Sequence, residues 1–214
     1  MFRSAPLVLL AAWSLSVALA GCSPPTTVTA ARGREVYQTC QPCHGNAAGG
    51  RHDLGAPALA GMADWYLRRQ LANYQSGMRG AHPDDLEGAR MRPMAKTLYR
   101  KQDLESVVLY LAALPPVKPP AALAGGDAAA GEARYALCAT CHGPRGAGMP
   151  EMQAPRIAGQ ADWYLYRQLQ KFKSGMRGAH PGDAMGAQMA AMAQTLEDTT
   201  AMKDVVAYVR TLAP

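Results

Sequence analysis

The pentapeptide Cys40-Gln41-Pro42-Cys43-His44 recurs later in the chain as Cys138-Ala139-Thr140-Cys141-His142. Both copies have the form C-x-x-C-H, which is typical of covalently attached c-type haem. In this chemistry each thiol forms a thioether to a haem vinyl group, and the histidine becomes the proximal ligand of the iron. A lone C-x-x-C also occurs in redox dithiols and in halves of zinc sites. Two copies, each completed by histidine, predict two covalently bound haem c groups, one on Cys40, Cys43 and His44 and one on Cys138, Cys141 and His142.

The same offset of 98 residues (138 − 40) relates much more of the chain than the two motifs. Residues 63–67, Ala-Asp-Trp-Tyr-Leu, recur at 161–165, and the whole block 76–83 recurs at 174–181. No gap is needed to align the two halves. Because only two copies occur, the pattern indicates a tandem duplication of one domain rather than a solenoid.

With 214 residues, of which 49% are hydrophobic and 18% charged, the chain has a normal globular composition and the length of two small domains. Residues 115–120, Pro-Pro-Val-Lys-Pro-Pro, predict a stiff, extended linker between the repeats. The predicted organisation is a signal peptide at 1–21, an extended tether at 22–32, haem domains at 33–114 and 127–214, and a Pro/Ala/Gly linker at 115–126.

Both repeats are predicted to be helical, because apolar residues recur at helical spacing and no convincing alternating strand pattern is present. Asp64 and Asp162 are predicted to cap the helices that follow them. The fold class is therefore all-α, with each duplicated domain wrapped around its own haem. The helices that lead into the motifs and close the repeats are expected at 33–39, 131–137, 103–114 and 200–212.

The N-terminus has the features of an export signal. Arg3 supplies a short positive region, and residues 7–20 form an apolar segment that is short for a membrane span. Leu19-Ala20-Gly21-Cys22 resembles a bacterial lipobox, whereas Ala18-Leu19-Ala20 also fits simple secretion. The lipobox accounts for the one cysteine outside the haem motifs. It predicts a protein that a lipid on Cys22 holds at the periplasmic side of a bacterial membrane.

The formal charge of +6 and the isoelectric point of about 9.2 do not indicate nucleic-acid binding. Basic residues are distributed over both halves of the chain, without a run of five or more. The propionates of two haems would offset most of the excess positive charge. We therefore expect no nucleic-acid partner.

Methionines shared by both repeats are the main candidates for the sixth iron ligand. Met91 and Met189 follow their haem histidines by 47 residues, and Met94 and Met192 follow by 50. A thioether is a soft, neutral ligand that suits ferrous haem and raises its potential relative to a second histidine. We expect this segment to be a loop before the last helix, because Pro93 disfavours a regular helix. Spacing alone does not separate the two pairs, so one pair is expected to ligate and the other to line the pocket.

Histidines offer a second type of sixth ligand. His82 and His180 lie in identical Arg-Gly-Ala-His-Pro segments. We favour the simpler interpretation, a turn residue that hydrogen-bonds locally or lies near a propionate, because the methionines already occupy the expected place. His52 has no counterpart in the second repeat and is expected to be exposed.

Over nearly all of its length after the tether, the chain resembles a dihaem class I cytochrome c of the cytochrome c4 type. The resemblance implies the cytochrome c fold in both repeats. The residues that carry it are Cys40 to Gly45, Pro57 to Gly61, Tyr66-Leu67, Gln70-Leu71, Met91 and Met94-Ala95 in the first repeat, and Cys138 to Gly143, Pro155 to Gly159, Tyr164-Leu165, Gln168-Leu169, Met189 and Met192-Ala193 in the second.

The resemblance assigns the sixth ligand that spacing leaves open. In that family the first methionine of the M-x-x-M stretch is the axial ligand, which implies this role for Met91 and Met189. Tyr99 and Glu197 depart from the serine that usually caps the last helix, so the start of that helix is open. The ligand assignment does not depend on that cap.

The family also implies a particular packing of the helices. Gly33 and Tyr37 of the first helix would pack against Tyr110 of the last, because the small glycine permits close approach. The two domains would face each other across a pseudo-twofold axis, with haem edges or propionates near the interface. The corresponding contact in the second repeat is made by Gly131, Tyr135 and Tyr208.

The predicted function is that of an electron carrier that transfers one electron per haem between respiratory complexes. The donor would be a quinol-oxidising complex or a dehydrogenase, and the acceptor a terminal oxidase or a reductase. One alternative is a dihaem oxidoreductase, of the peroxidase type or of the thiosulfate-oxidising type, which uses a distal cysteine on its active haem. Another is a fixed electron relay within a terminal oxidase, because the Arg-Gly-Ala-His-Pro segment also resembles haem domains attached to some oxidase subunits.

Overall fold

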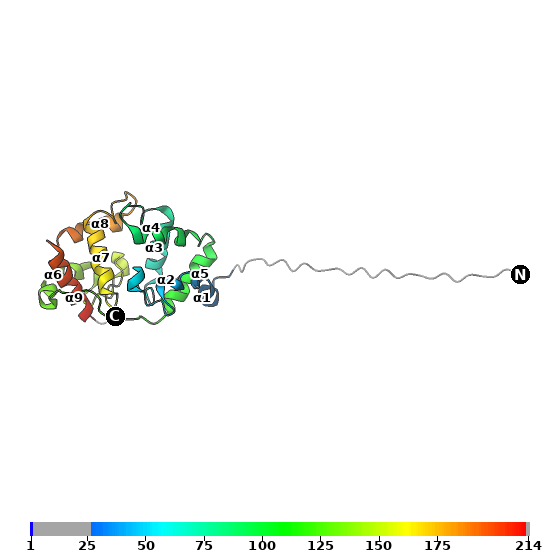
Figure 1. The fold of residues 1–214 in the computed structure, drawn as a ribbon, viewed down its shortest axis with the longest axis horizontal. Helices are drawn as coiled ribbons and strands as arrows, with labels where there is room; N and C mark the ends of the chain where they lie inside the picture. The colour runs from blue at the N-terminus through cyan, green and yellow to red at the C-terminus, as the bar shows by residue number, and fades with distance from the viewer. Residues whose placement is uncertain (2–26, 213–214) are drawn as a thin grey trace.

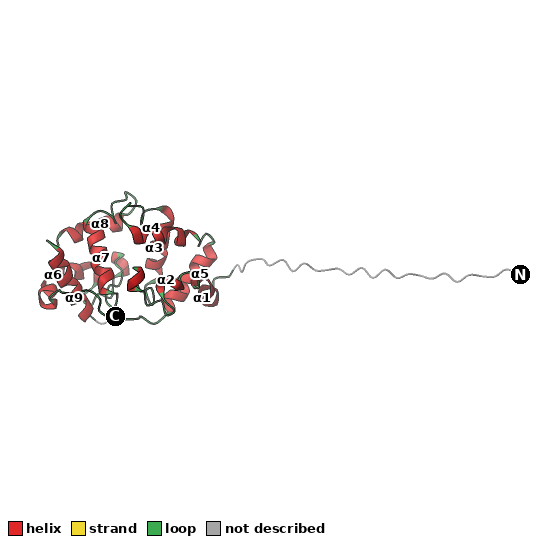
Figure 2. Ribbon diagram, in the orientation of Figure 1, coloured by secondary structure: helices red, strands yellow, loops and turns green. Residues whose placement is uncertain are grey.

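The computed structural model describes Met1 and residues 27–212 of the chain (Figure 1). In these residues all regular structure is helical, apart from two isolated β-bridges (Figure 2). The predicted signal peptide and Cys22 lie outside the described residues, as does most of the predicted tether. No helix within the described part is long and apolar enough to cross a membrane.

The first repeat is built on two helices that meet at a glycine. A Cβ atom on Gly33 would lie only 2.0 Å from the Ser106 carbonyl oxygen, so glycine is required for the first and last helices to pack this closely. The rings of Tyr37 and Tyr110 pack beside this contact at 5.6 Å, which confirms the predicted packing. The elements are α1 (Ala30–Tyr37), α2 (Gln41–His44), η1 (His52–Leu54), α3 (Asp64–Ser76), α4 (Leu86–Lys96) and α5 (Lys101–Ala113).

The second repeat has the same order of elements, with its first two helices fused into one. Pro42, near the start of α2, lacks an N–H group and begins a separate short helix, whereas its counterpart Thr140 continues the first helix. Tyr135 and Tyr208 pack at 5.2 Å, as predicted. The elements are α6 (Ala128–His142), η2 (Pro150–Met152), α7 (Asp162–Lys173), α8 (Ala184–Gln194) and α9 (Thr199–Thr211).

Several predicted helix starts are wrong. The caps of α3 and α7 are Ala63 and Ala161, and the aspartates Asp64 and Asp162 are the first helical residues, where they complement the helix dipole. Asp162 also accepts the Trp163 N–H at 2.7 Å. Helix α1 begins at Ala30, capped by the Thr29 hydroxyl, so the last three residues assigned to the tether are helical.

The expected loop around Met91 and Met94 is also wrong, because these residues lie in α4. Pro93 sits inside this helix, and α8 has the same extent with Ala191 at the equivalent position. Proline costs the helix one hydrogen bond. The Asp85 cap and the burial of one face of α4 outweigh that cost.

Each repeat encloses its own apolar core, and the two halves lie side by side (Figure 1). The linker is extended, as predicted, and it is packed onto both halves. Val117 packs against the first core, Pro119 is buried, and the Ala122 N–H donates to Asp162 at the start of α7. The linker therefore fixes the halves to each other as well as joining them.

Candidate haem sites and the interface between them

The first haem motif occupies a single helical turn. Cys40 is the N-cap of α2, and Cys43 and His44 lie within the helix. Residues three and four apart share one face of a helix, so the two thiols and the imidazole are presented to the same side. Both cysteines are free thiols. This arrangement suits two thioether bonds and one axial bond to the same haem.

A backbone carbonyl holds each haem histidine in one orientation. Nδ1 of His44 lies 2.9 Å from the Pro57 carbonyl oxygen, and Nδ1 of His142 lies 2.8 Å from that of Pro155. A carbonyl oxygen only accepts, so Nδ1 carries the proton and Nε2 keeps a lone pair for a metal. Burial lowers the pKa of both histidines and keeps the rings neutral. These are the tautomer and the charge that a haem iron requires.

The turn after each histidine is fixed in the same way in both repeats. The Tyr37 hydroxyl donates to the Gly45 carbonyl at 2.7 Å, and the Tyr135 hydroxyl donates to the Gly143 carbonyl at 2.7 Å. Both glycines have positive φ, near +79°, which a residue with a side chain rarely adopts. The first helix of each repeat, through its tyrosine, thus anchors the motif.

Burial disfavours the first thiol of each cysteine motif as a redox nucleophile. Burial raises the pKa of the Cys40 thiol to about 11, and it also raises the pKa of Cys138. Thiols that are protonated at neutral pH are poor redox nucleophiles. The described residues also contain no group of three or more histidine, cysteine, aspartate or glutamate side chains that could hold another metal ion.

The candidate sixth ligands lie on α4 and α8. Met91 and Met189 are half-buried, and Met91 shares a helix face with the buried Gly88 and Ala95. Met94 and Met192 are 37% and 38% exposed. Both pairs therefore lie on well-defined helices, and the choice of Met91 and Met189 stays a prediction.

The three histidines outside the motifs make local or interdomain contacts. Nδ1 of His82 accepts the Asp84 N–H at 3.2 Å, and Nδ1 of His180 accepts the Gly182 N–H at 3.0 Å, which agrees with the simpler interpretation of both as turn residues. His52 is exposed, as expected, but its ring also packs on Trp163 of the second half at 5.0 Å.

A pseudo-symmetric pair of buried arginines crosses the interface between the halves. Arg79 donates to Gln70 of its own half at 2.7 Å and to Gln168 of the other at 3.0 Å. Arg177 repeats this pattern with Gln168 at 2.8 Å and Gln70 at 3.0 Å. This agrees with the predicted pseudo-twofold arrangement of the domains.

These two guanidinium groups form no ion pair with any carboxylate of the described chain. Buried charges are normally paired. Haem propionates are anions that the predicted arrangement brings near this interface, so the environment of Arg79 and Arg177 fits two haem groups. Both arginines belong to the repeated block, residues 76–83 and 174–181, but nothing local in the sequence indicates that they are buried at an interface.

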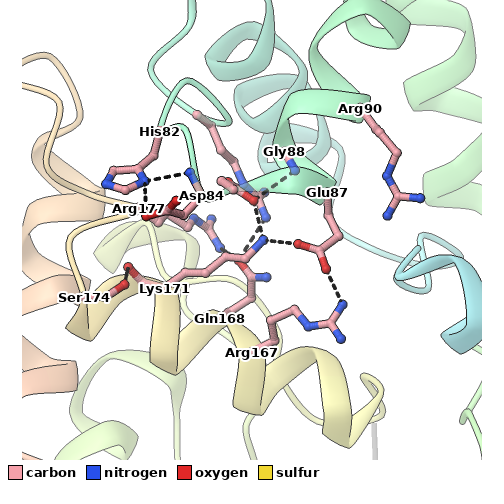
Figure 3. Close-up of polar contacts among 12 residues, drawn as sticks. His82, Asp84, Glu87, Gly88, Arg90, Arg167, Gln168, Lys171, Ser174 and Arg177 are labelled. Atoms are coloured by element: carbon pink, nitrogen blue, oxygen red, sulfur yellow. Dashed lines mark hydrogen bonds and ion pairs between the residues drawn. The ribbon is translucent and has the colours of Figure 1, made fainter.

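A second cluster at the interface has no symmetry mate (Figure 3). Lys171 of α7 is buried, and its ammonium group binds both Asp85, the cap of α4, and Glu87 in the first turn of α4, the latter at 2.8 Å. Arg167 donates to the other oxygen of Glu87 at 2.7 Å. Although partial burial raises the pKa of Glu87, the hydrogen bond from Lys171 holds it below its ordinary value. Through these ion pairs the second half binds α4, the helix that carries Met91.

Two segments, residues 30–115 and 128–213, match the family described as cytochrome c. The chain belongs to the cytochrome c family. It is a dihaem cytochrome of the cytochrome c4 kind, with covalent haem c expected on Cys40 and Cys43 and on Cys138 and Cys141. The all-α fold with two tandem class I domains and the two haem c groups, both predicted from the sequence, are confirmed.

Three known proteins illustrate the range of its relatives. The cytochrome is 33% identical, over 85% of its length and 84% of the relative's, to a thiosulfate dehydrogenase electron acceptor of Stutzerimonas stutzeri. It superposes on reduced recombinant cytochrome c4 from Pseudomonas stutzeri with a TM-score of 0.67 and 27% identity, covering 87% of this chain and all of that one. It superposes on the thiosulfate dehydrogenase TsdBA from Marichromatium purpuratum with a TM-score of 0.72 and 34% identity, covering 86% of this chain but only 40% of that protein.

Proposed function

We propose that this cytochrome is an exported electron carrier that transfers one electron per haem between respiratory complexes. The observation that carries the proposal is the equivalence of the two sites. Each has the same histidine–carbonyl bond and the same pair of methionines on a capped helix. Six-coordinate haem exchanges electrons with little change in coordination and leaves no position open to a substrate.

The polypeptide contributes a rigid ligand set. The Pro57 and Pro155 carbonyls fix the imidazoles, and Met91 and Met189, held on α4 and α8, are our candidates for the opposite ligands. Ligands that are already oriented need not move when the charge of the iron changes. The cofactor performs the redox step, and these residues set its potential.

The relatives support a dehydrogenase as the electron donor. The S. stutzeri relative is named as the electron acceptor of thiosulfate dehydrogenase, so we propose a thiosulfate-oxidising dehydrogenase as donor, with a quinol-oxidising complex as the other candidate. The acceptor would be a terminal oxidase or a reductase. A fixed relay subunit of such an oxidase would use the same chemistry.

The second candidate function is thiosulfate oxidation by this chain itself. The likeness to a thiosulfate dehydrogenase is the observation that favours it. The thiosulfate-oxidising type considered from the sequence needs a distal cysteine, and every cysteine except Cys22 belongs to a haem motif. Cys22 precedes both domains. A peroxidase would need one iron with a free position, which the two equivalent methionine pairs do not favour.

Carbon monoxide separates the carrier from the enzymes. We expect the optical spectrum of the fully reduced holoprotein to stay unchanged under carbon monoxide. We also expect thiosulfate to reduce the haems only when a thiosulfate dehydrogenase is added. A carbon monoxide shift at one haem, or reduction by thiosulfate alone, would contradict the carrier function.

We further propose that a lipid on Cys22 holds the cytochrome at the periplasmic face of the membrane. Cys22→Ala should move the holoprotein from the membrane fraction to the soluble periplasmic fraction without changing its haem spectrum. Wild-type protein found wholly in the soluble fraction would instead support simple secretion.

A further inference from the structure

The peptide group that orients His44 in the first domain is bound by a glutamine of the second domain. Gln160, which lies just before α7, accepts the Ala58 N–H at 3.3 Å and donates to the Ala58 carbonyl at 3.0 Å. The Ala58 N–H and the Pro57 carbonyl belong to the same peptide group, and that carbonyl accepts from Nδ1 of His44. A continuous chain of hydrogen bonds therefore runs from the haem histidine to the other domain.

This chain can act on the imidazole in two ways. A peptide group is rigid and planar, so a residue that anchors its N–H also fixes the direction of its carbonyl. Hydrogen bonds in series also polarise one another, so the bond to Gln160 makes the Pro57 carbonyl a better acceptor for His44. The amide oxygen of Gln160 is itself held in place, because it also accepts the Ala161 N–H at 2.9 Å.

The first domain does not hold this peptide group by itself. Ala58 is buried, and in the part of the chain that the structure describes its N–H and carbonyl bond to no residue other than Gln160. The next two N–H groups, of Leu59 and Ala60, both bind the Ala48 carbonyl of the same domain. Buried backbone groups are normally paired, and here both partners come from across the interface.

The second domain lacks the equivalent glutamine. At the repeat offset of 98 residues, Met62 corresponds to Gln160, and Arg156 corresponds to Ala58. A thioether has no proton to donate and is a weak acceptor, so methionine cannot pair with a peptide as glutamine does. The Met62 sulfur instead lies 3.8 Å from the Arg156 guanidinium, which donates to it.

No other side chain of the first domain takes over this role. Among the described residues, none from the first domain bonds to the peptide between Pro155 and Arg156. Arg69 comes nearest along the chain, because it donates to the Gln153 carbonyl at 3.1 Å, two residues before Pro155. The support of the haem histidine by the opposite domain is therefore one-sided.

We propose that Gln160 is a positioning residue for the first haem, through which the second domain lowers the potential of that haem. By holding the Pro57 carbonyl on His44, it makes the imidazole a more basic ligand, and a more basic ligand favours ferric iron. The second haem receives no such action from the first domain. The proposal rests on the electron-carrier function and deepens it, because it gives the two haems of one carrier different potentials.

The test uses two variants of Gln160 and one control, all as holoprotein. Gln160→Met copies Met62 and removes both bonds to Ala58. Gln160→Asn keeps an amide that is one methylene too short to reach both groups, and it guards against a loss of folding in the first variant. The control, Arg69→Lys, keeps its charge but breaks the forked contact with Gln153, which is an interdomain contact away from the Pro57 peptide. Redox titration gives the potential of each haem, and nuclear magnetic resonance gives the solvent exchange rate of the His44 Nδ1 proton.

We expect both Gln160 variants to raise the potential of the first haem and to leave that of the second unchanged. Exchange of the His44 Nδ1 proton should become about tenfold faster, because two hydrogen bonds that limit opening of the segment are lost. Arg69→Lys should leave the potential of the first haem and the exchange rate at their wild-type values.

An unchanged potential of the first haem in both Gln160 variants would overturn the proposal. Equal shifts at both haems, or the same shift in Arg69→Lys, would overturn it too, because the cause would then be a general loosening of the interface. The carrier function is tested separately by carbon monoxide on the reduced wild-type protein. The exchange rate of the His44 proton reports on Gln160 whether or not that test supports a carrier.

Discussion

The two domains have the same fold in the same register, yet they use charge very differently. Helix α4 has an acidic first turn and a basic last turn, whereas the equivalent α8 contains no charged residue. Lys171 of the second domain binds the cap of α4, but Asn73, its counterpart, makes no such contact with Asp183, the cap of α8. The residues that orient the haem histidines are repeated in both domains, while the surfaces have diverged. Two haem sites with the same attachment motif therefore lie in different electrostatic surroundings.

The largest expected effect tests whether the haem ligands really are equivalent. Met91→Ala should leave the haem covalently attached, lower the potential of the first haem and open it to carbon monoxide. Met189→Ala should do the same to the second haem. Loss of an axial thioether should shift the potential by a sizeable part of the roughly 0.8 V range that axial ligands span. Redox titration with optical detection measures both effects.

Met94→Ala and Met192→Ala are the matched controls for ligation. Each should keep its haem closed to carbon monoxide and near the wild-type potential. The opposite pattern, with the first haem unchanged in Met91→Ala and open in Met94→Ala, would move the assignment to Met94 and Met192.

The next prediction tests how much the ion pair between Lys171 of the second domain and α4 stabilises the first domain. Lys171→Asn, which copies Asn73, leaves Asp85 buried without its cation. Removing one partner of a buried ion pair costs about 3–5 kcal/mol. We expect the free energy of unfolding of the first domain to fall by about this amount in denaturant titrations followed at the first haem. Asn73→Ala is the control and should cost much less.

A double variant separates charge from packing at the same place. Asp85→Asn in the Lys171→Asn background removes the uncompensated charge, while asparagine can still cap α4. We expect it to recover part of the lost stability. If the double variant is less stable than Lys171→Asn alone, the coupling between the two residues is not electrostatic.

A smaller effect concerns the start of the last helix, where the domains differ again. Asp198 caps α9 by accepting the Ala201 N–H at 2.8 Å, whereas Arg100 at the start of α5 makes no capping bond. Asp198→Ala should lower the stability of the second domain by about 1 kcal/mol. Arg100→Ala should leave the stability of the first domain almost unchanged. Similar losses of stability in both domains would show that the Asp198 cap is not what stabilises the start of α9.

The smallest effect is a pH dependence of the stability that the cluster of Lys171, Asp85 and Glu87 provides. Because the pKa of Glu87 in the folded protein lies below its ordinary value of 4.5, the ionised form is favoured by folding. Its contribution is present above pH 4.5 and is lost as the pH falls through the folded pKa. The wild-type protein should lose about 0.5 kcal/mol of stability in this way as the pH falls. We expect Glu87→Gln to abolish this loss when the free energy of unfolding is measured against pH. An unchanged pH profile would mean that Glu87 adds no stability at the interface.

Much of the fold followed from periodic features of the sequence. The haem motif and the repeat offset depend on residue types at fixed spacing, whereas the glycine–tyrosine packing was implied by the resemblance to cytochrome c4; these predictions hold. The start of the last helix, which the departure at Glu197 left open, is set by the next residue, Asp198, in the second domain. No comparable signal exists at Arg100, where α5 begins without a side-chain cap.

Other features could not be predicted from the sequence, because long-range contacts decide them. The segment around Pro93 was expected to be a loop, but its cap and its packing on α3 make it a helix. Lys171 and Arg79 could not be singled out, since nothing local in the sequence shows that each is buried against the other domain. A hint was present in the repeat itself: Lys171 replaces asparagine and Glu87 replaces methionine at matched positions.

The linker has a consequence for how strongly the domains need to attract each other. Anchored through Val117 on the first core and Ala122 on Asp162, the short connection keeps the facing surfaces at a high effective concentration, in the millimolar range for short tethers. The contacts of Arg79, Arg177 and Lys171 would form between separate molecules only at sufficient concentration, whereas the linker keeps them formed at any concentration. The proximity of the two haem domains is in this sense a property of the covalent chain, and a single cut in the linker would make it depend on protein concentration.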